Sequence, residues 1–161
     1  MSNAQAFAGT AEPVADREIV TTRVFNYPRE QVFEAFRNPN RLAQWWGPKG
    51  FSKTFHEFDL RPGGHWRFVM HGPNGGDFQN ESIFVEVAAP ECVVFDHLSG
   101  HLFRMTQTYE DMDGKTKLTW RMLHVSAAEC EKAKAFVPRC NEENFDRLEA
   151  VLSQSTQELS H

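Results

Sequence analysis

Seven histidines are the side chains of this 161-residue chain best suited to acid–base or metal chemistry near neutral pH. Five of them are spread over several predicted strands and their connections: His65, His71, His97, His101 and His124. We expect His65 and His71 to face solvent, whereas His97 and His124 could face the interior at strand ends. A metal site needs several ligands that converge with a set geometry. We therefore predict no metal site, no cofactor and ordinary polar roles for these histidines.

Gln107 is the polar side chain with the most informative position. It alternates with Met105 and Tyr109 in an inward register. A buried amide without a partner costs about 1–3 kcal/mol. One hypothesis is a hydrogen bond that orients a ligand in an apolar cavity, and the other is a bond to a neighbouring side chain or a buried water. Asn141 and Asn144 allow the same two interpretations, with plain exposure favoured.

The acidic residues and the loops show no catalytic motif. Four acids form no convincing pair for general acid–base work, and we expect them to be solvated: Glu57, Asp59, Glu86 and Asp96. The loop over 71–76 lacks the Gly-Lys-Ser/Thr of a phosphate-binding loop, and no nucleophile elbow is present. The catalytic residues are therefore unknown, and acid–base chemistry by Gln107 or His124 stays a hypothesis.

Composition places the chain among globular proteins with a single domain. A length of 161 residues suffices for a real core, and the aromatic residues, 12% of the chain, could either fill that core or line a cavity in it. The net charge of −5, without a dense Lys/Arg run, argues against nucleic acid as a partner. No stretch approaches the roughly 20 apolar residues of a membrane span, and the N-terminus lacks signal-peptide order. Three cysteines without metal or redox spacing favour reduced thiols and a cytoplasmic location.

The order of elements predicts a meandering sheet. Residues 1–16 are small and polar and predict a flexible N-terminal tail. A first strand over 18–26 precedes two short helices, one over 29–38 and one over 42–45. Clusters of Gly, Pro and Asp then separate six further runs typical of strands: Lys53–Leu60, His65–His71, Phe78–Val87, Val93–Leu98, Phe103–Glu110 and Thr116–Val125.

The C-terminal segment is predicted to be helical and to need a partner surface. Ser126 is a suitable N-cap, and Glu129 three residues later completes a capping box. Pro138 either kinks the helix or restarts it. Beyond it, an apolar stripe has only the apolar face of the sheet to pack against. The residues of the stripe and of that face include Phe145, Leu148 and Leu152 on the helix, with Trp66, Phe68, Leu118, Trp120 and Met122 on the strands.

The predicted fold class is therefore α+β. A curved antiparallel sheet of about six to seven strands wraps around a long C-terminal helix, and two short helices follow the first strand. We expect one domain over 17–153 and a C-terminal tail over 154–161.

Two motifs carry a resemblance to a known superfamily. They are Trp-Trp-Gly-Pro over 45–48, after the short helices, and Arg-Pro-Gly-Gly over 61–64, in the second hairpin. With the order of elements, they make the chain similar to the helix-grip superfamily of START-like and polyketide-cyclase-like (SRPBCC) proteins over 17–153. It most resembles bacterial stand-alone proteins related to the C-terminal domain of the activator of the heat-shock-protein-90 ATPase. The resemblance implies a helix-grip fold and carries over no catalytic residue.

We predict that the domain binds a small, largely apolar molecule between the sheet and the C-terminal helix. The aromatic surplus at inward positions favours this function. The resemblance also implies it, because members of the superfamily bind lipids, polyketides or other apolar molecules. The candidate pocket-lining residues are Trp46, Phe51, Trp66, Phe68, Gln107, Trp120, Met122, His124, Phe136 and Phe145.

Two alternatives remain open. The first is an enzyme of the polyketide-cyclase or hydrolase type that uses the same cavity. The second is a chaperone-interaction module that regulates the heat-shock-protein-90 ATPase. We expect no counterpart of the separate N-terminal domain of that co-chaperone, which favours the small molecule over a chaperone partner. A two-fold homodimer is compatible with the resemblance, and the sequence indicates no surface for it.

Overall fold

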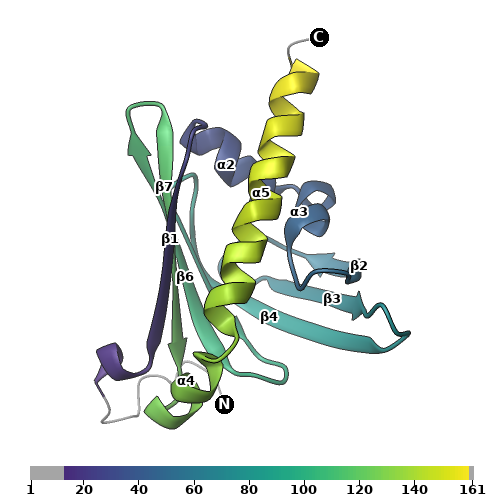
Figure 1. Ribbon diagram of the computed structural model, residues 1–161, viewed down its shortest axis with the longest axis vertical. Coiled ribbons are helices and arrows are strands. Elements are labelled where there is room, and N and C mark those ends of the chain that lie inside the picture. The colour runs from purple at the N-terminus through teal and green to yellow at the C-terminus, as the bar shows by residue number, and fades with distance from the viewer. Residues whose placement is uncertain (1–12, 160–161) are drawn as a thin grey trace.

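Seven antiparallel strands form one sheet in the order β1-β7-β6-β5-β4-β3-β2 (Figure 1). The computed structural model describes residues 13–159, with side chains through Gln154. The strands are β1 (Glu18–Phe25), β2 (Ser52–Phe58), β3 (His65–His71), β4 (Asp77–Ala88), β5 (Cys92–His97), β6 (Phe103–Met112) and β7 (Lys115–His124). The helices are η1 (Val14–Asp16), α2 (Arg29–Arg37), α3 (Pro39–Trp45), α4 (Ala127–Ala133) and α5 (Val137–Leu159). The predicted α+β helix-grip architecture is confirmed.

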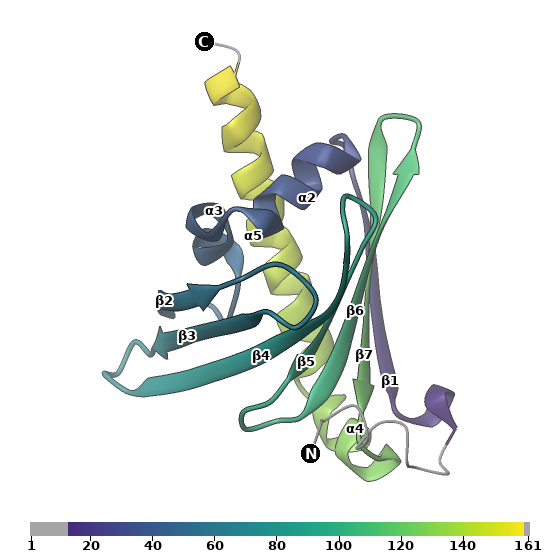
Figure 2. The ribbon, with the colours of Figure 1, turned by 180° about the vertical axis from the view of Figure 1, so that it is seen from behind.

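Consecutive strands pair as hairpins from β2 to β7, and β1 pairs with β7. The register shifts by one residue between Phe55 and Glu57 in β2, and again between Phe84 and Glu86 in β4. Such bulges bend a strand and increase its twist. Both views show the resulting curvature, with β1 and β7 steep and β2, β3 and β4 running across the molecule (Figures 1 and 2).

The Arg-Pro-Gly-Gly turn ties the β2–β3 connection to β4. Gly63 has a φ of +83°, which glycine adopts without strain. A Cβ on Gly64 would lie 1.9 Å from the carbonyl oxygen of Asp59, so only glycine fits there. The backbone of this turn exchanges two hydrogen bonds with Phe84, at 2.8 and 2.9 Å. The motif therefore fixes the ends of the strands that form one wall of the inner face.

Helix α5 lies across the inner face of the sheet, and α2 and α3 pack near its middle (Figures 1 and 2). The predicted stripe of Phe145, Leu148 and Leu152 is buried, as are the inward residues of the strands. Ser126 caps α4 by accepting a hydrogen bond from the backbone N–H of Glu129 at 3.1 Å. Pro138 lies in the first turn of α5, so the chain restarts a helix there.

Both predicted tails differ in part from the structure. Residues 14–16 of the predicted N-terminal tail form η1, and residues 1–12 lie outside the described residues. Helix α5 continues to Leu159, past the predicted boundary at 153, because the stretch after Leu152 contains no Gly or Pro to end it. None of the described helices is both long and apolar enough to cross a bilayer.

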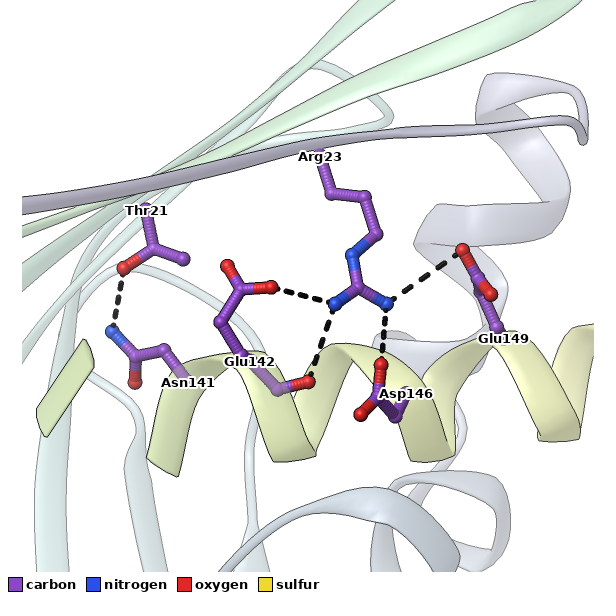
Figure 3. A network of polar contacts seen from close by, with 6 residues as sticks. All are labelled: Thr21, Arg23, Asn141, Glu142, Asp146 and Glu149. Carbon is purple, nitrogen blue, oxygen red and sulfur yellow. Dashed lines mark hydrogen bonds and ion pairs between the residues drawn. The ribbon is translucent and has the colours of Figure 1, made fainter. Parts of the chain in front are cut away.

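Polar contacts set the position of α5 relative to β1 (Figure 3). The guanidinium of Arg23 on β1 lies 2.7 Å from Glu142, 2.9 Å from Asp146 and 3.7 Å from Glu149. These acids occupy one side of α5 at i, i+4 and i+7 spacing. One residue before Glu142, the amide nitrogen of Asn141 donates a hydrogen bond of 3.0 Å to the Thr21 hydroxyl. These contacts fix the helix along the sheet and so define the space between the two.

Candidate functional site

A cavity of about 250 Å³ lies between the inner face of the sheet and the first turns of α5. Strands β3 to β7 form one wall, and the Trp-Trp-Gly-Pro segment after α3 forms part of another. Among the described residues that line it, none is Asp, Glu, Lys or Arg. Half of the lining residues are Trp, Phe or Met, and the others include three Asn and two His. Such a lining is typical of a site for an uncharged, mainly apolar ligand.

Three tryptophans line the cavity, Trp46, Trp66 and Trp120, and Trp45 packs against two of them. The ring of Trp46 lies 5.0 Å from that of Trp66 and 5.2 Å from that of Trp120. The indole N–H of Trp45 donates a hydrogen bond of 2.9 Å to the carbonyl of Ala35. In contrast, the buried indole nitrogens of Trp66 and Trp120 have no hydrogen-bond partner among residues 13–159. Buried indole N–H groups normally find a partner, so two donors are left over at the cavity wall.

Basic side chains hold the Trp-Trp-Gly-Pro segment against α5. Arg147 donates hydrogen bonds to the carbonyls of Trp45 and Gly47, and to the side-chain oxygen of Asn144 at 2.9 Å. That oxygen also accepts a hydrogen bond of 3.0 Å from the backbone N–H of Gly47. Lys53 donates to the carbonyl of Trp46, and burial together with the positive charge of Arg147 lowers the pKa of Lys53 to about 8. These bonds satisfy the carbonyls of an irregular segment and fix its tryptophans.

Histidines gather at the other end of the cavity. His97 and His124 continue the inward registers of β5 and β7, and Phe103 lies between them on β6. The ring of His97 stacks on Phe103 with centroids 4.8 Å apart and donates from Nδ1 to the carbonyl of His101 at 2.7 Å. The rings of His101 and His124 lie 4.9 Å apart. A hairpin turn and three strands therefore bring together imidazoles that are up to 27 residues apart in the chain (124 − 97).

The three imidazoles are held in their neutral form. The pKa values of His97, His101 and His124 are lowered from 6.5, mainly because burial disfavours the charged ring. His101 lowers the pKa of the other two further, whereas Glu129 raises the pKa of His101 and His124. The histidine end of the cavity is therefore polar but uncharged at neutral pH.

We expect the free energy of unfolding to be lower at pH 5.5 than at pH 7.5. Below pH ~6.5 the imidazoles of the unfolded chain take up protons that the folded chain excludes, so acid favours the unfolded state. The contribution of these histidines to the free energy of unfolding is complete above pH ~6.5. It is lost as the pH falls toward their lowered pKa values in the folded protein. Its slope reaches at most about 1.4 kcal/mol per pH unit for each histidine.

Urea denaturation at the two pH values measures this effect. The His124→Asn variant should lose less stability than the wild type between pH 7.5 and pH 5.5, because one of the excluded protonation sites is gone. Equal losses in the two proteins would contradict the assignment.

A family model decides the relationship of the chain to known proteins. The model described as "Activator of Hsp90 ATPase homolog 1-like protein" (AHSA1) matches residues 26–153. The chain belongs to the AHSA1-like family. The match spans the region from the end of β1 to α5, and so includes the cavity and both motifs.

Solved structures of low sequence identity share the fold of this AHSA1-like chain. A protein of Nitrosomonas europaea is 21% identical, with 90% of this chain and 99% of that chain covered and a TM-score of 0.82. A protein of Arthrobacter aurescens is 22% identical, with coverages of 89% and 90% and a TM-score of 0.80. A protein of Rhodobacter sphaeroides is 21% identical, with coverages of 89% and 97% and a TM-score of 0.81. A comparison with curated proteins finds no match.

The structure places six of the ten predicted site residues at the cavity of this AHSA1-like protein. They are Trp46, Trp66, Phe68, Trp120, Met122 and Phe136. Phe51 lies instead in a neighbouring hollow beside Phe78, with the ring centroids 5.9 Å apart. His124 is not a lining residue, but its ring contacts those of His101 and Phe103, which line the cavity. Which of these residues bind a ligand stays a prediction.

Gln107 and Phe145 are buried but lie outside the cavity lining. The side-chain oxygen of Gln107 accepts a hydrogen bond of 3.0 Å from the Tyr109 hydroxyl, which is the non-ligand alternative for this amide. Its amide nitrogen has no partner among the described residues. Phe145 packs edge-on against Trp120, with centroids 4.6 Å apart, and is not a lining residue. Both positions are inward, but an inward direction does not decide between filling space and lining it.

Sequence reasoning missed several lining residues of this AHSA1-like cavity. Asn141 and Asn144 were expected to be exposed, yet both are buried and line it. Their positions one helical turn before Phe145 and Leu148 placed them on the sheet-facing side, which is a signal that the apolar stripe alone did not capture. His97 and His101 also line the cavity, and their H-x-x-x-H spacing could have drawn attention to them.

One other group of polar side chains resembles a catalytic arrangement but does not form a site. Thr54, His71 and Asp77 align as hydroxyl, imidazole and carboxylate, with distances of 2.7 and 2.8 Å. They lie exposed near one edge of the sheet, and none of them lines the cavity, so no substrate position accompanies them. Within residues 13–159, no three His, Cys, Asp or Glu side chains converge as a metal site would require.

Proposed function

We propose that this protein binds a small, uncharged and largely apolar molecule in the cavity between the sheet and α5. The observation that carries the proposal is the composition of the cavity wall. The described lining combines tryptophan, phenylalanine and methionine side chains with no formal charge. A solid core would have filled this space with side chains, because protein interiors are packed as densely as organic crystals.

The size of the cavity limits the ligand. An apolar cavity of roughly 150 Å³ is enough to bind benzene. The volume of about 250 Å³ in this protein therefore suits a molecule of about two rings or a short branched chain. A long lipid chain would extend beyond it.

The two unpaired indole N–H groups indicate one further property of the ligand. Trp66 and Trp120 line the cavity, and their buried nitrogens can only donate hydrogen bonds. A ligand that brings an acceptor oxygen to this end would satisfy a donor that is otherwise unpaired. We therefore expect the ligand to be an apolar body with at least one oxygen atom.

A space-filling substitution in the cavity tests the proposal. Val137 on α5 is buried and lines the cavity, so Val137→Phe should lower the affinity for naphthalene at least tenfold by occupying the same space. Isothermal titration calorimetry measures the affinity. Arg139→Phe, at an exposed position of the same helix, is the matched control and should leave binding unchanged.

The wild-type protein itself provides the decisive result. If a panel of uncharged one-ring and two-ring compounds gives neither calorimetric heat nor a shift in melting temperature, the proposed function is wrong. Acid–base catalysis by Gln107 receives no support from its contact with Tyr109. The chaperone alternative is supported only by the name of the family, and a homodimer stays a prediction.

A further inference from the structure

Two imidazole nitrogens at the histidine end of the cavity lack a hydrogen-bond partner among the described residues. They are Nε2 of His101 and Nε2 of His124, and both atoms are buried. His124 is fully buried, His101 lines the cavity, and the centroids of their rings lie 4.9 Å apart. An unpaired polar atom inside a protein is unfavourable, so a partner that reaches from the cavity past His101 to His124 would be stabilised by both nitrogens.

The backbone determines which nitrogen of His124 carries the proton. Nδ1 of His124 lies 3.2 Å from the carbonyl oxygen of Arg17, and a carbonyl can only accept. Nδ1–H therefore donates to Arg17, and Nε2 of the neutral ring is a bare acceptor. No described contact restricts Nε2 of His101, which is free to carry a proton and donate it. The pair thus offers one acceptor and one donor, on rings whose centroids lie 4.9 Å apart.

We propose that the ligand of this cavity carries a hydroxyl group that binds between His101 and His124. Its O–H donates to Nε2 of His124, and its oxygen accepts from Nε2–H of His101. A hydroxyl group is both donor and acceptor at one atom, which is what this pair requires. The inference deepens the proposed function and rests on it.

Other polar groups fit this end of the cavity less well. A carboxylate has no proton to donate to Nε2 of His124. An ammonium group would find no Asp or Glu in the described lining, because Glu129, which acts on both histidines, lies outside it. An ether or ketone oxygen would satisfy His101 but leave the acceptor on His124 unpaired. The rings of Phe103 and Phe136 flank His101 at 5.7 and 6.4 Å, so the carbon atoms next to the hydroxyl meet an aromatic surface.

Three naphthalene derivatives test the inference on the full chain. They are naphthalene, 2-naphthol and 2-methoxynaphthalene, which share two rings and differ in having no oxygen, a hydroxyl group, and an oxygen without a proton. We expect 2-naphthol to bind about tenfold more tightly than 2-methoxynaphthalene by calorimetry, because only the hydroxyl satisfies both histidines. Equal affinities for the three compounds would overturn the inference and leave the proposed function intact. No binding of any of them would count against the proposed function itself.

Two variants test whether the preference for 2-naphthol over 2-methoxynaphthalene depends on His101 and His124. His101→Phe and His124→Phe should each reduce the ratio of the two affinities to about one. His56→Phe, at an exposed position of β2, is the control and should keep the ratio. A tenfold preference that persists in His101→Phe and His124→Phe would also overturn the inference.

A spectroscopic measurement does not depend on the folding of a variant. In wild-type protein labelled with ¹⁵N at histidine, the resonance of Nε2 of His124 should move on addition of 2-naphthol, because a bare acceptor gains a hydrogen bond. It should move much less with 2-methoxynaphthalene, which has no proton to donate. An equal response to both compounds would show that the hydroxyl does not reach His124.

Discussion

Replacing Phe145 by alanine is expected to lower the free energy of unfolding by about 3–5 kcal/mol, the usual cost of removing a buried aromatic ring from a core. Phe145 is 0% exposed, and its ring packs edge-on against Trp120 at 4.6 Å and Phe25 at 5.6 Å. The guanidinium of Arg23 covers the ring at 5.5 Å from its centroid. Truncation would therefore leave a void between α5 and the sheet, where the surrounding rings can close it only in part.

Equilibrium denaturation in urea measures this loss. Phe78→Ala is the matched control, because it removes the same ring from a side chain that is 53% exposed, and it should cost less than about 1 kcal/mol. A loss below about 1 kcal/mol for Phe145→Ala would show that this ring does not hold α5 on the sheet. The comparison also separates a core role from the ligand-lining role that the sequence predicted for Phe145.

Replacing Arg104 by methionine is expected to be about as damaging, at about 3–5 kcal/mol. Arg104 on β6 and Asp96 on β5 are directly paired across the strands. Two parallel hydrogen bonds of 2.7 and 2.9 Å join the guanidinium to the carboxylate, whose side chain is only 3% exposed. Without the arginine, the carboxylate would stay buried with its counter-charge removed, which is the costly way to break a buried ion pair.

A double variant distinguishes the pair from its surroundings. Asp96→Leu combined with Arg104→Met removes both charges, and we expect it to recover most of the stability lost by Arg104→Met alone. Arg121→Met is the control, because its partner Glu18 lies 3.2 Å away in a pair whose arginine is half exposed, and it should cost less than about 1 kcal/mol. If the double variant were no more stable than Arg104→Met, the unpaired carboxylate would not be the cause.

The sequence determined the architecture because the signals for it are local. Alternation along Trp66-Arg67-Phe68 and Leu118-Thr119-Trp120 assigns the inner face of the sheet, since side chains of a strand alternate with period two. Ser126 and Pro138 mark the starts of α4 and α5 by capping and by a fixed φ. These properties depend on a few neighbouring residues, and the structure confirmed them.

Only the tertiary structure decided which inward side chains fill space and which line it. Trp120 and Phe145 are both inward and aromatic, yet the first lines the cavity and the second does not. The side-chain oxygen of Gln107 accepts a hydrogen bond from the Tyr109 hydroxyl and does not face the cavity. His101 and His124 meet because a hairpin turn and the end of β7 come together in the folded chain. Whether an inward side chain fills space or lines the cavity depends on packing between distant segments. Hydrophobic periodicity and turn residues carry no information about that packing.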